Sequence, residues 1–139
     1  MLRRMSIPST TGQSGDGRAN KTLRILLVED HLDTQRLMSR VLESLKHDVK
    51  SADSVRAALA LASAHPFDLV ISDLGLPDGN GAQMMRELRE KHGLKGIALS
   101  GFEEDDEFNA PGNDAGFIAH LTKPISFEKL EEAIGLLGN

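Results

Sequence analysis

A chain of 139 residues, of which 40% are hydrophobic, is long enough for one packed core and favours a single domain. The absence of cysteine excludes disulfide bonds and thiolate metal sites, and it is expected of a protein in the reducing cytoplasm. A net charge of −5 argues against nonspecific nucleic-acid binding, and no apolar run is long enough for membrane insertion or a secretory signal.

Residues 1–22 have the composition of a linker. They are rich in Ser, Thr and Gly, show no apolar periodicity, and carry four basic side chains against one acidic side chain. We interpret them as a disordered, solvated extension, although their basic charge also suits contact with an anionic partner. The folded domain is expected over residues 23–139.

The first part of this domain alternates strand and helix. The apolar run 24–28 predicts a strand, and apolar residues at helical spacing predict an amphipathic helix over about 31–46. Asp30 is suited to cap the first turn of that helix. A short strand over 48–52 follows, and then a second helix that ends before Pro66.

The centre of the chain predicts a buried strand followed by a tight loop. Residues 67–72 are apolar on both faces, as in a central parallel strand. Residues 73–80 are dense in turn formers, and we interpret Asp78-Gly79-Asn80-Gly81 only as a turn and a helix start. Asn80 and Gln83 resemble a capping pair, which predicts a helix from there to about His92.

The last part predicts strands over 95–100 and 117–121 and a final helix that Ser126 is suited to cap. Proline, glycine and asparagine interrupt the segment 102–116, so we expect the fourth helix to be short or irregular, over about 103–109. Because strand and helix alternate throughout, the sequence predicts an α/β fold, with a doubly wound parallel sheet and helices on both faces.

Reactive side chains fall at the carboxyl ends of the predicted strands. Glu29 and Asp30 follow the first strand, Asp73 follows the third, Ser100 closes the fourth and Lys123 follows the fifth. Ligands of open parallel sheets bind at this edge. We therefore expect three carboxylates, one hydroxyl and one ammonium to meet at one point.

Clustered carboxylates repel one another unless a cation or protons intervene. Since the cluster offers oxygen donors without cysteine or a well-placed histidine, the expected ion is Mg²⁺, with Mn²⁺ as a substitute. A carboxylate on such an ion can attack a phosphoryl group, and Asp73 has the best position for that role, beside the Lys123 ammonium and the Ser100 hydroxyl. Four histidines at helix ends and in loops are interpreted as solvated: His31, His47, His65 and His92.

Four short motifs, in their order and spacing, resemble those of response-regulator receiver domains. They are Val28-Glu29-Asp30, Ser72-Asp73-Leu74-Gly75-Leu76-Pro77-Asp78-Gly79, Ala98-Leu99-Ser100-Gly101 and Leu121-Thr122-Lys123-Pro124. The resemblance covers about residues 23–138, which is essentially the whole predicted domain. It implies a flavodoxin-like sheet of five strands in the order 2-1-3-4-5.

The resemblance also implies a role for each residue of the cluster. Asp73 would be the phospho-acceptor and a metal ligand. Asp30 would bind Mg²⁺ directly, Glu29 would act largely through water, and the Gly75 carbonyl would be a further ligand. Lys123 would pair with the phosphoryl group.

Ser100 would be the switch hydroxyl that moves to meet the phosphoryl group, and the Lys123–Pro124 bond would be cis. The family usually has an aromatic residue three positions before the lysine, where this chain has His120. This departure is similar to receivers at the carboxyl end of hybrid sensor kinases. The titratable ring of His120 would then take part in the switch and respond to pH.

The function implied is a phosphorylation-controlled signalling module rather than an enzyme, since it would catalyse only its own phosphorylation and dephosphorylation. It would take a phosphoryl group from a histidine kinase or a histidine phosphotransfer protein onto Asp73. It would then change its contacts with a downstream protein through the face formed by residues 102–139. The linker-like residues 1–22 suit both a standalone regulator and a fragment of a hybrid kinase.

Three alternatives from other classes remain. A Mg²⁺-dependent phosphohydrolase would use a strand-end aspartate, but Gly75 stands where its second aspartate is expected. A flavodoxin-like nucleotide-binding protein would need a glycine-rich loop after the first strand, where this chain has the anionic Glu29-Asp30-His31. A constitutive interaction module would carry a vestigial site, which the intact cluster disfavours.

The resemblance implies that the residues two positions past Asp73 and two past Ser100 tune the lifetime of the phosphoryl group. The residues there are Gly75 and Phe102, and neither can orient an attacking water by hydrogen bonding. We expect slow self-dephosphorylation, measured as the decay of the phosphorylated species by intact mass. A phosphoryl half-life of only seconds in Mg²⁺ would contradict this expectation.

Overall fold

A computed structural model describes residues 22–100 and 116–138, and within them five parallel strands form one sheet. The strand order is β2-β1-β3-β6-β7, because the labels β4 and β5 fall on a short separate hairpin. The expected order 2-1-3-4-5 is therefore confirmed. The sheet strands are β1 (Arg24–Val28), β2 (Asp48–Ala52), β3 (Leu69–Asp73), β6 (Lys95–Ser100) and β7 (Phe117–Thr122).

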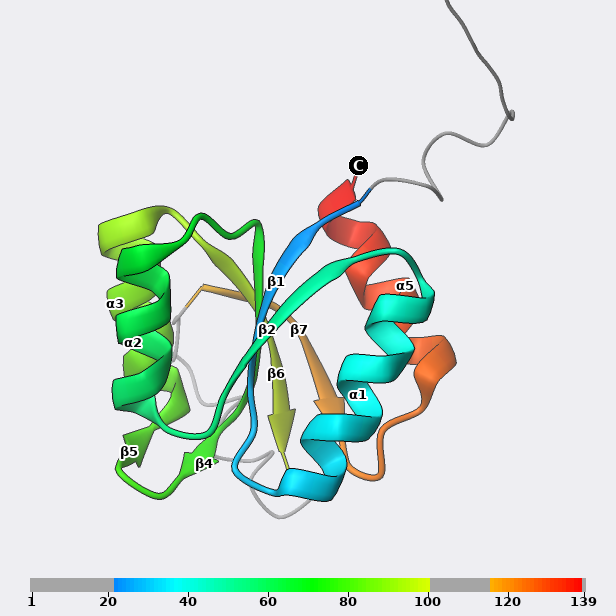
Figure 1. Cartoon of the computed structure of the whole chain (residues 1–139), viewed down its shortest axis with the longest axis horizontal. Coiled ribbons are helices and arrows are strands. Elements are labelled where there is room, and N and C mark those ends of the chain that lie inside the picture. Colours follow the sequence, from blue (N-terminus) through cyan, green and yellow to red (C-terminus); the bar gives the residue numbers. More distant parts are fainter. Residues whose placement is uncertain (1–21, 101–115, 139) are drawn as a thin grey trace, which may run out of the picture.

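Among residues 22–100 and 116–138, helices cover both faces of the sheet (Figure 1). Helices α1 (Leu32–Ser44) and α5 (Phe127–Gly138) lie on one face, while α2 (Val55–Ala64) and α3 (Gly81–His92) lie on the other. The short helix expected over 103–109 lies outside the described residues, as does nearly all of the expected extension 1–22. Within the described parts, no helix is both long and apolar enough to cross a membrane.

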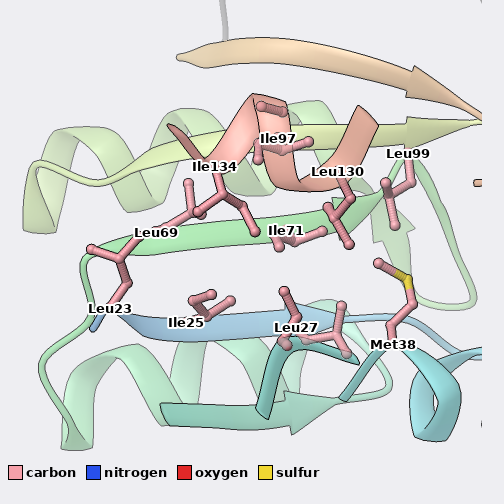
Figure 2. Close-up of a cluster of buried hydrophobic side chains, with 12 residues drawn as sticks. Leu23, Ile25, Leu27, Met38, Leu69, Ile71, Ile97, Leu99, Leu130 and Ile134 are labelled. Atoms are coloured by element: carbon pink, nitrogen blue, oxygen red, sulfur yellow. The ribbon is translucent and has the colours of Figure 1, made fainter. Parts of the chain in front are cut away.

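The core has two halves because successive side chains of a strand point to opposite faces of the sheet. Ile25 and Leu27 of β1 pack toward α1 and α5, in the cluster drawn in Figure 2. Leu26 and Val28 pack toward α2 and α3. All four side chains are fully buried. A strand covered on both faces has no place for a polar side chain until it ends, so the polar residues gather at the sheet's carboxyl edge.

Hydrogen bonds at the helix starts test the predicted caps. The Asn80 side chain accepts two backbone N–H groups of α3, and the Ser126 hydroxyl accepts one from α5, so both predicted caps are confirmed. The predicted Asp30 cap is wrong. The backbone is still extended at His31, so the N-cap of α1 is that residue, and its side chain makes no capping hydrogen bond.

The central strand is shifted relative to its predicted range of 67–72. It runs from Leu69 to Asp73, and Asp73 pairs in register with Leu99 of β6. Asp68 precedes the strand, where its carboxylate binds the backbone and guanidinium of Arg24 on the surface. Asp73 is therefore fixed by the sheet itself rather than placed on a free loop.

The loop after β3 is more than a turn. Its two short strands, β4 (Gly75–Leu76) and β5 (Gly79–Asn80), pair antiparallel. Between them, the Asp78 carboxylate accepts the backbone N–H groups of Val55 and Arg56, at 2.7 and 3.0 Å, and so caps α2 from outside. These two hydrogen bonds lower the pKa of Asp78.

His47 was interpreted as solvated, and the structure corrects this. The ring is half-buried, and its Nδ1 accepts the backbone N–H of Leu23 at 3.1 Å, just before β1. Burial lowers the pKa of His47 below its ordinary value of 6.5, because the charged ring would lose hydration. A protonated Nδ1 also could not accept this hydrogen bond.

Stability should therefore fall on acidification through His47. The folded state has the lower pKa, so the stability from the neutral ring is present above pH 6.5 and is lost as the pH falls through the folded-state pKa. Urea unfolding near neutral pH and at mildly acidic pH measures this loss. His47→Gln keeps an acceptor without titrating, so it should lose less stability than the wild type, by on the order of a few tenths of a kcal/mol for this partly exposed ring. Equal losses in both proteins would contradict the assignment.

Candidate functional site

The parallel register brings the ends of the strands to one edge. Hydrogen bonds continue past the strand ends, from the Glu29 N–H to Ala52, from the Leu74 N–H to Leu99 and from the Lys123 N–H to Ser100, at 2.8 to 3.0 Å. These bonds hold the residues that follow the strands as firmly as the strands themselves.

Glu29, Asp73 and Lys123 meet at this edge. The Lys123 ammonium lies 2.9 Å from Asp73 Oδ2 and 3.3 Å from Glu29 Oε1. The Glu29 side chain is fully buried, that of Asp73 nearly so, and that of Lys123 is about a quarter exposed. Burial lowers the pKa of Lys123, but the hydrogen bond and charge of Asp73 and the charge of Glu29 outweigh it and leave the pKa raised. Lys123 is thus a cation held between two buried carboxylates.

Asp30 and His31 complete the cluster on its exposed side. Single ligand atoms from Glu29, Asp30, His31 and Asp73 all lie within 4.8 Å of one another. The His31 ring, interpreted as solvated, is 70% exposed, yet its Nδ1 lies 3.0 Å from Glu29 Oε2 and 3.4 Å from Asp30 Oδ1. The hydrogen bond to Glu29 and the charge of Asp30 raise the pKa of His31.

The two oxygens of Glu29 have different surroundings. Oε2 accepts hydrogen bonds from the backbone N–H and the ring of His31. Oε1 is buried and has no hydrogen-bond partner among the described residues, although it lies in ion-pair range of Lys123. A buried carboxylate oxygen without a hydrogen bond is costly unless a cation neutralises it. Lys123 is the cation beside this oxygen, and the ligand atoms of the wider cluster also fit a divalent metal ion.

Two glycines border Asp73. The Gly75 N–H donates to Asp73 Oδ1 at 3.2 Å, while the expected role of its carbonyl remains a prediction. Gly81, the first residue of α3, was interpreted from the sequence only as part of a turn and helix start. A Cβ there would lie 2.4 Å from the Asp73 carbonyl oxygen and 2.9 Å from the Leu74 Cα, so only glycine lets α3 start this close to the acceptor.

Ser100 and His120 form a second group, on neighbouring strands. The buried Ser100 hydroxyl at the end of β6 is joined to His120 Nε2 of β7 by a hydrogen bond of 2.5 Å. This contact places His120 beside the hydroxyl, as a switch role for both residues requires. The Lys123–Pro124 bond that follows β7 is cis. Phe102 lies outside the described residues.

Comparisons with known proteins agree with this geometry. Residues 25–135 match the family model of the response regulator receiver domain. The chain is 30% identical over 111 residues to the response regulator protein PilR of Pseudomonas aeruginosa, and 31% identical over 134 residues to the virulence sensor protein BvgS of Bordetella bronchiseptica. These matches cover 80% and 91% of this chain but only 25% and 11% of those two proteins.

Solved structures show the same fold. A receiver domain of Methylobacillus flagellatus, described as CheY-like, superposes with a TM-score of 0.75 at 28% identity, over 84% of this chain and 99% of the other. The family model spans most of the chain, and the strand order of the sheet is the one expected of the family. The chain therefore belongs to the response regulator receiver domain family.

Proposed function

We propose that this domain accepts a phosphoryl group on Asp73 from the phosphohistidine of a histidine kinase or a phosphotransfer protein. The observation that carries the proposal is the nearly buried Asp73 carboxylate, with the Lys123 ammonium 2.9 Å from its Oδ2 at the carboxyl edge of the sheet. An acceptor needs a carboxylate oxygen for attack and a fixed cation beside the transferred group.

In the transfer, an Asp73 oxygen forms a bond to phosphorus as the phosphorus–nitrogen bond of the donor breaks, and the donor imidazole leaves with that electron pair. The product is an acyl phosphate, whose added negative charge lies beside Lys123. Because Lys123 already pairs with Asp73 and Glu29, it can shift toward the new charge without crossing the site. Lys123 thus stabilises both the transfer and its product.

Asp30, Glu29 and Asp73 would hold Mg²⁺, or Mn²⁺ in its place, together with the Gly75 carbonyl. The fit rests on the cluster of their ligand atoms and on the buried Glu29 Oε1, which lacks a hydrogen bond within the described chain. When bound, the ion neutralises charge on the phosphoryl oxygens. Asp30 is the more exposed carboxylate, which suits direct binding of an ion that keeps several waters.

The signal would leave the site through Ser100 and His120. A phosphoryl group on Asp73 offers charged oxygens that attract the Ser100 hydroxyl more strongly than the imidazole ring of His120 does. Ser100 would then leave His120, and the altered contact on β7 would change the face formed by β7 and α5. A downstream protein would bind that face, in keeping with the predicted partner surface over residues 102–139.

Mutation of Asp73 tests the acceptor. Incubation with Mg²⁺ and acetyl phosphate should add one phosphoryl group to the wild-type protein, measured by intact mass, and Asp73→Asn should show none. Asp68→Asn is a matched control, because Asp68 lies at the opposite end of β3 and binds Arg24 on the surface. It should be phosphorylated like the wild type. An unmodified wild-type protein, as expected of a phosphorylation-independent interaction module, would overturn the proposal.

Replacement of Ser100 tests the switch. In wild-type protein and in Ser100→Thr, which keeps the hydroxyl, phosphorylation should shift the ¹⁵N NMR resonance of His120 Nε2, because the hydroxyl moves away from the ring. In Ser100→Ala the hydroxyl is already gone, so phosphorylation should still occur but the resonance should shift much less. A His120 resonance that phosphorylation leaves unchanged in the wild type would contradict the switch.

A further inference from the structure

We propose that His31 is a ligand of the cation bound at this edge. Its imidazole nitrogen would make the site bind divalent ions that favour nitrogen ligands, such as Co²⁺, Ni²⁺ and Zn²⁺, more tightly than Mg²⁺. The inference rests on the cation site of the proposed function and adds a ligand and an ion preference to it. It also corrects the expectation that the cluster offers no well-placed histidine, because His31 Nδ1 belongs to the set of ligand atoms.

The spacing of the ligand atoms supports this role. Neighbouring ligands about 2.1 Å from one ion lie about 3.0 Å apart in octahedral geometry and about 3.4 Å apart in tetrahedral geometry. His31 Nδ1 lies 3.0 Å from Glu29 Oε2 and 3.4 Å from Asp30 Oδ1. The nitrogen is thus spaced from both carboxylates as neighbouring ligands on one metal are.

A second observation points into the same space. Glu29 Oε1 is buried and lacks a hydrogen bond within the described chain. It lies 3.3 Å from the Lys123 ammonium, which also lies 2.9 Å from Asp73 Oδ2. The cluster therefore contains a buried carboxylate oxygen that has a cation beside it but no hydrogen bond, which leaves it able to bind a further cation.

The rest of His31 leaves the ring available. The residue is the N-cap of α1, but its side chain caps nothing. Its backbone N–H donates to Glu29 Oε2 at 3.1 Å, so the residue stays beside the carboxylate whether or not the ring does. The ring is largely exposed, and metal binding would replace its hydrogen bond to Glu29 with a bond to the ion.

The chemical consequence is a change in selectivity. Mg²⁺ prefers oxygen ligands and loses water reluctantly, so an imidazole adds little to its binding. Co²⁺, Ni²⁺ and Zn²⁺ bind imidazole well. His31 should therefore strengthen the binding of these ions far more than that of Mg²⁺.

Calorimetric titration of tag-free, metal-stripped protein with Co²⁺ and with Mg²⁺ tests the proposal. Wild-type protein should bind Co²⁺ more tightly than Mg²⁺, and His31→Ala should weaken Co²⁺ binding by about tenfold or more, with a smaller effect on Mg²⁺. The visible absorption spectrum of bound Co²⁺ should also change, because a nitrogen ligand is lost. His65→Ala, at an exposed histidine after α2, is the matched control and should keep the wild-type ratio of affinities.

His31→Gln separates a ligand from a residue that only positions Glu29. Glutamine can still hydrogen-bond to the carboxylate but offers no imidazole nitrogen, so it should lose the Co²⁺ preference as alanine does. Restoration of that preference by glutamine, equal weakening of both ions in His31→Ala, or the absence of any Co²⁺ preference in the wild type would each overturn the proposal. Failure of the proposed function would appear separately, as wild-type protein that gains no phosphoryl group in Mg²⁺.

Discussion

The carboxyl edge of the sheet depends on the pairing of two buried carboxylates, Glu29 and Asp73, with the Lys123 ammonium. Glu29 and Asp73 are carried to one edge by neighbouring strands, and their charges cannot remain close together without a cation. Removing one partner of such a buried group costs about 3 to 5 kcal/mol, against about 0 to 1 kcal/mol for a surface pair such as Arg24 with Asp68. Because Lys123 is partly exposed, the cost of removing it should lie near the lower end of the range for buried pairs. The fold thus keeps a site whose carboxylates favour a bound cation. A metal ion would bind there for this reason, and the positive charge would in turn assist transfer of a phosphoryl group.

Much of this arrangement follows from local sequence. Runs of apolar residues predict the strands because a strand covered on both faces admits only such side chains, and the first polar residue after each run marks the functional edge. Glu29, Asp73, Ser100 and Lys123 were predicted in this way, and the strand order followed from the family resemblance. The caps at Asn80 and Ser126 were predicted because capping is an interaction within a few residues.

Two of the features that sequence reasoning missed, Gly81 and His47, depend on contacts between distant segments. Gly81 matters because α3 starts against the backbone of Asp73, and no local pattern records how close two segments pass. His47 is half-buried because it receives the N–H of Leu23, 24 residues earlier in the chain. The role of His31, the third missed feature, was the easiest to predict from the sequence, since this residue directly follows Glu29 and Asp30. Its exposure concealed its role, because an exposed histidine is usually solvated, and only the distances show that its ring turns toward the carboxylates.

The Asp78 carboxylate couples the loop after β3 mechanically to the first turn of α2. It caps α2 from the loop that joins Asp73 to α3, although α2 contributes no side chain to the cluster. Local opening of that loop would break the hydrogen bonds at the first turn of α2 as well as those of the hairpin. Amide hydrogen exchange of the loop and of that turn should then report one shared opening event. The accessibility of the acceptor is in this way tied to the stability of a helix with no chemical role.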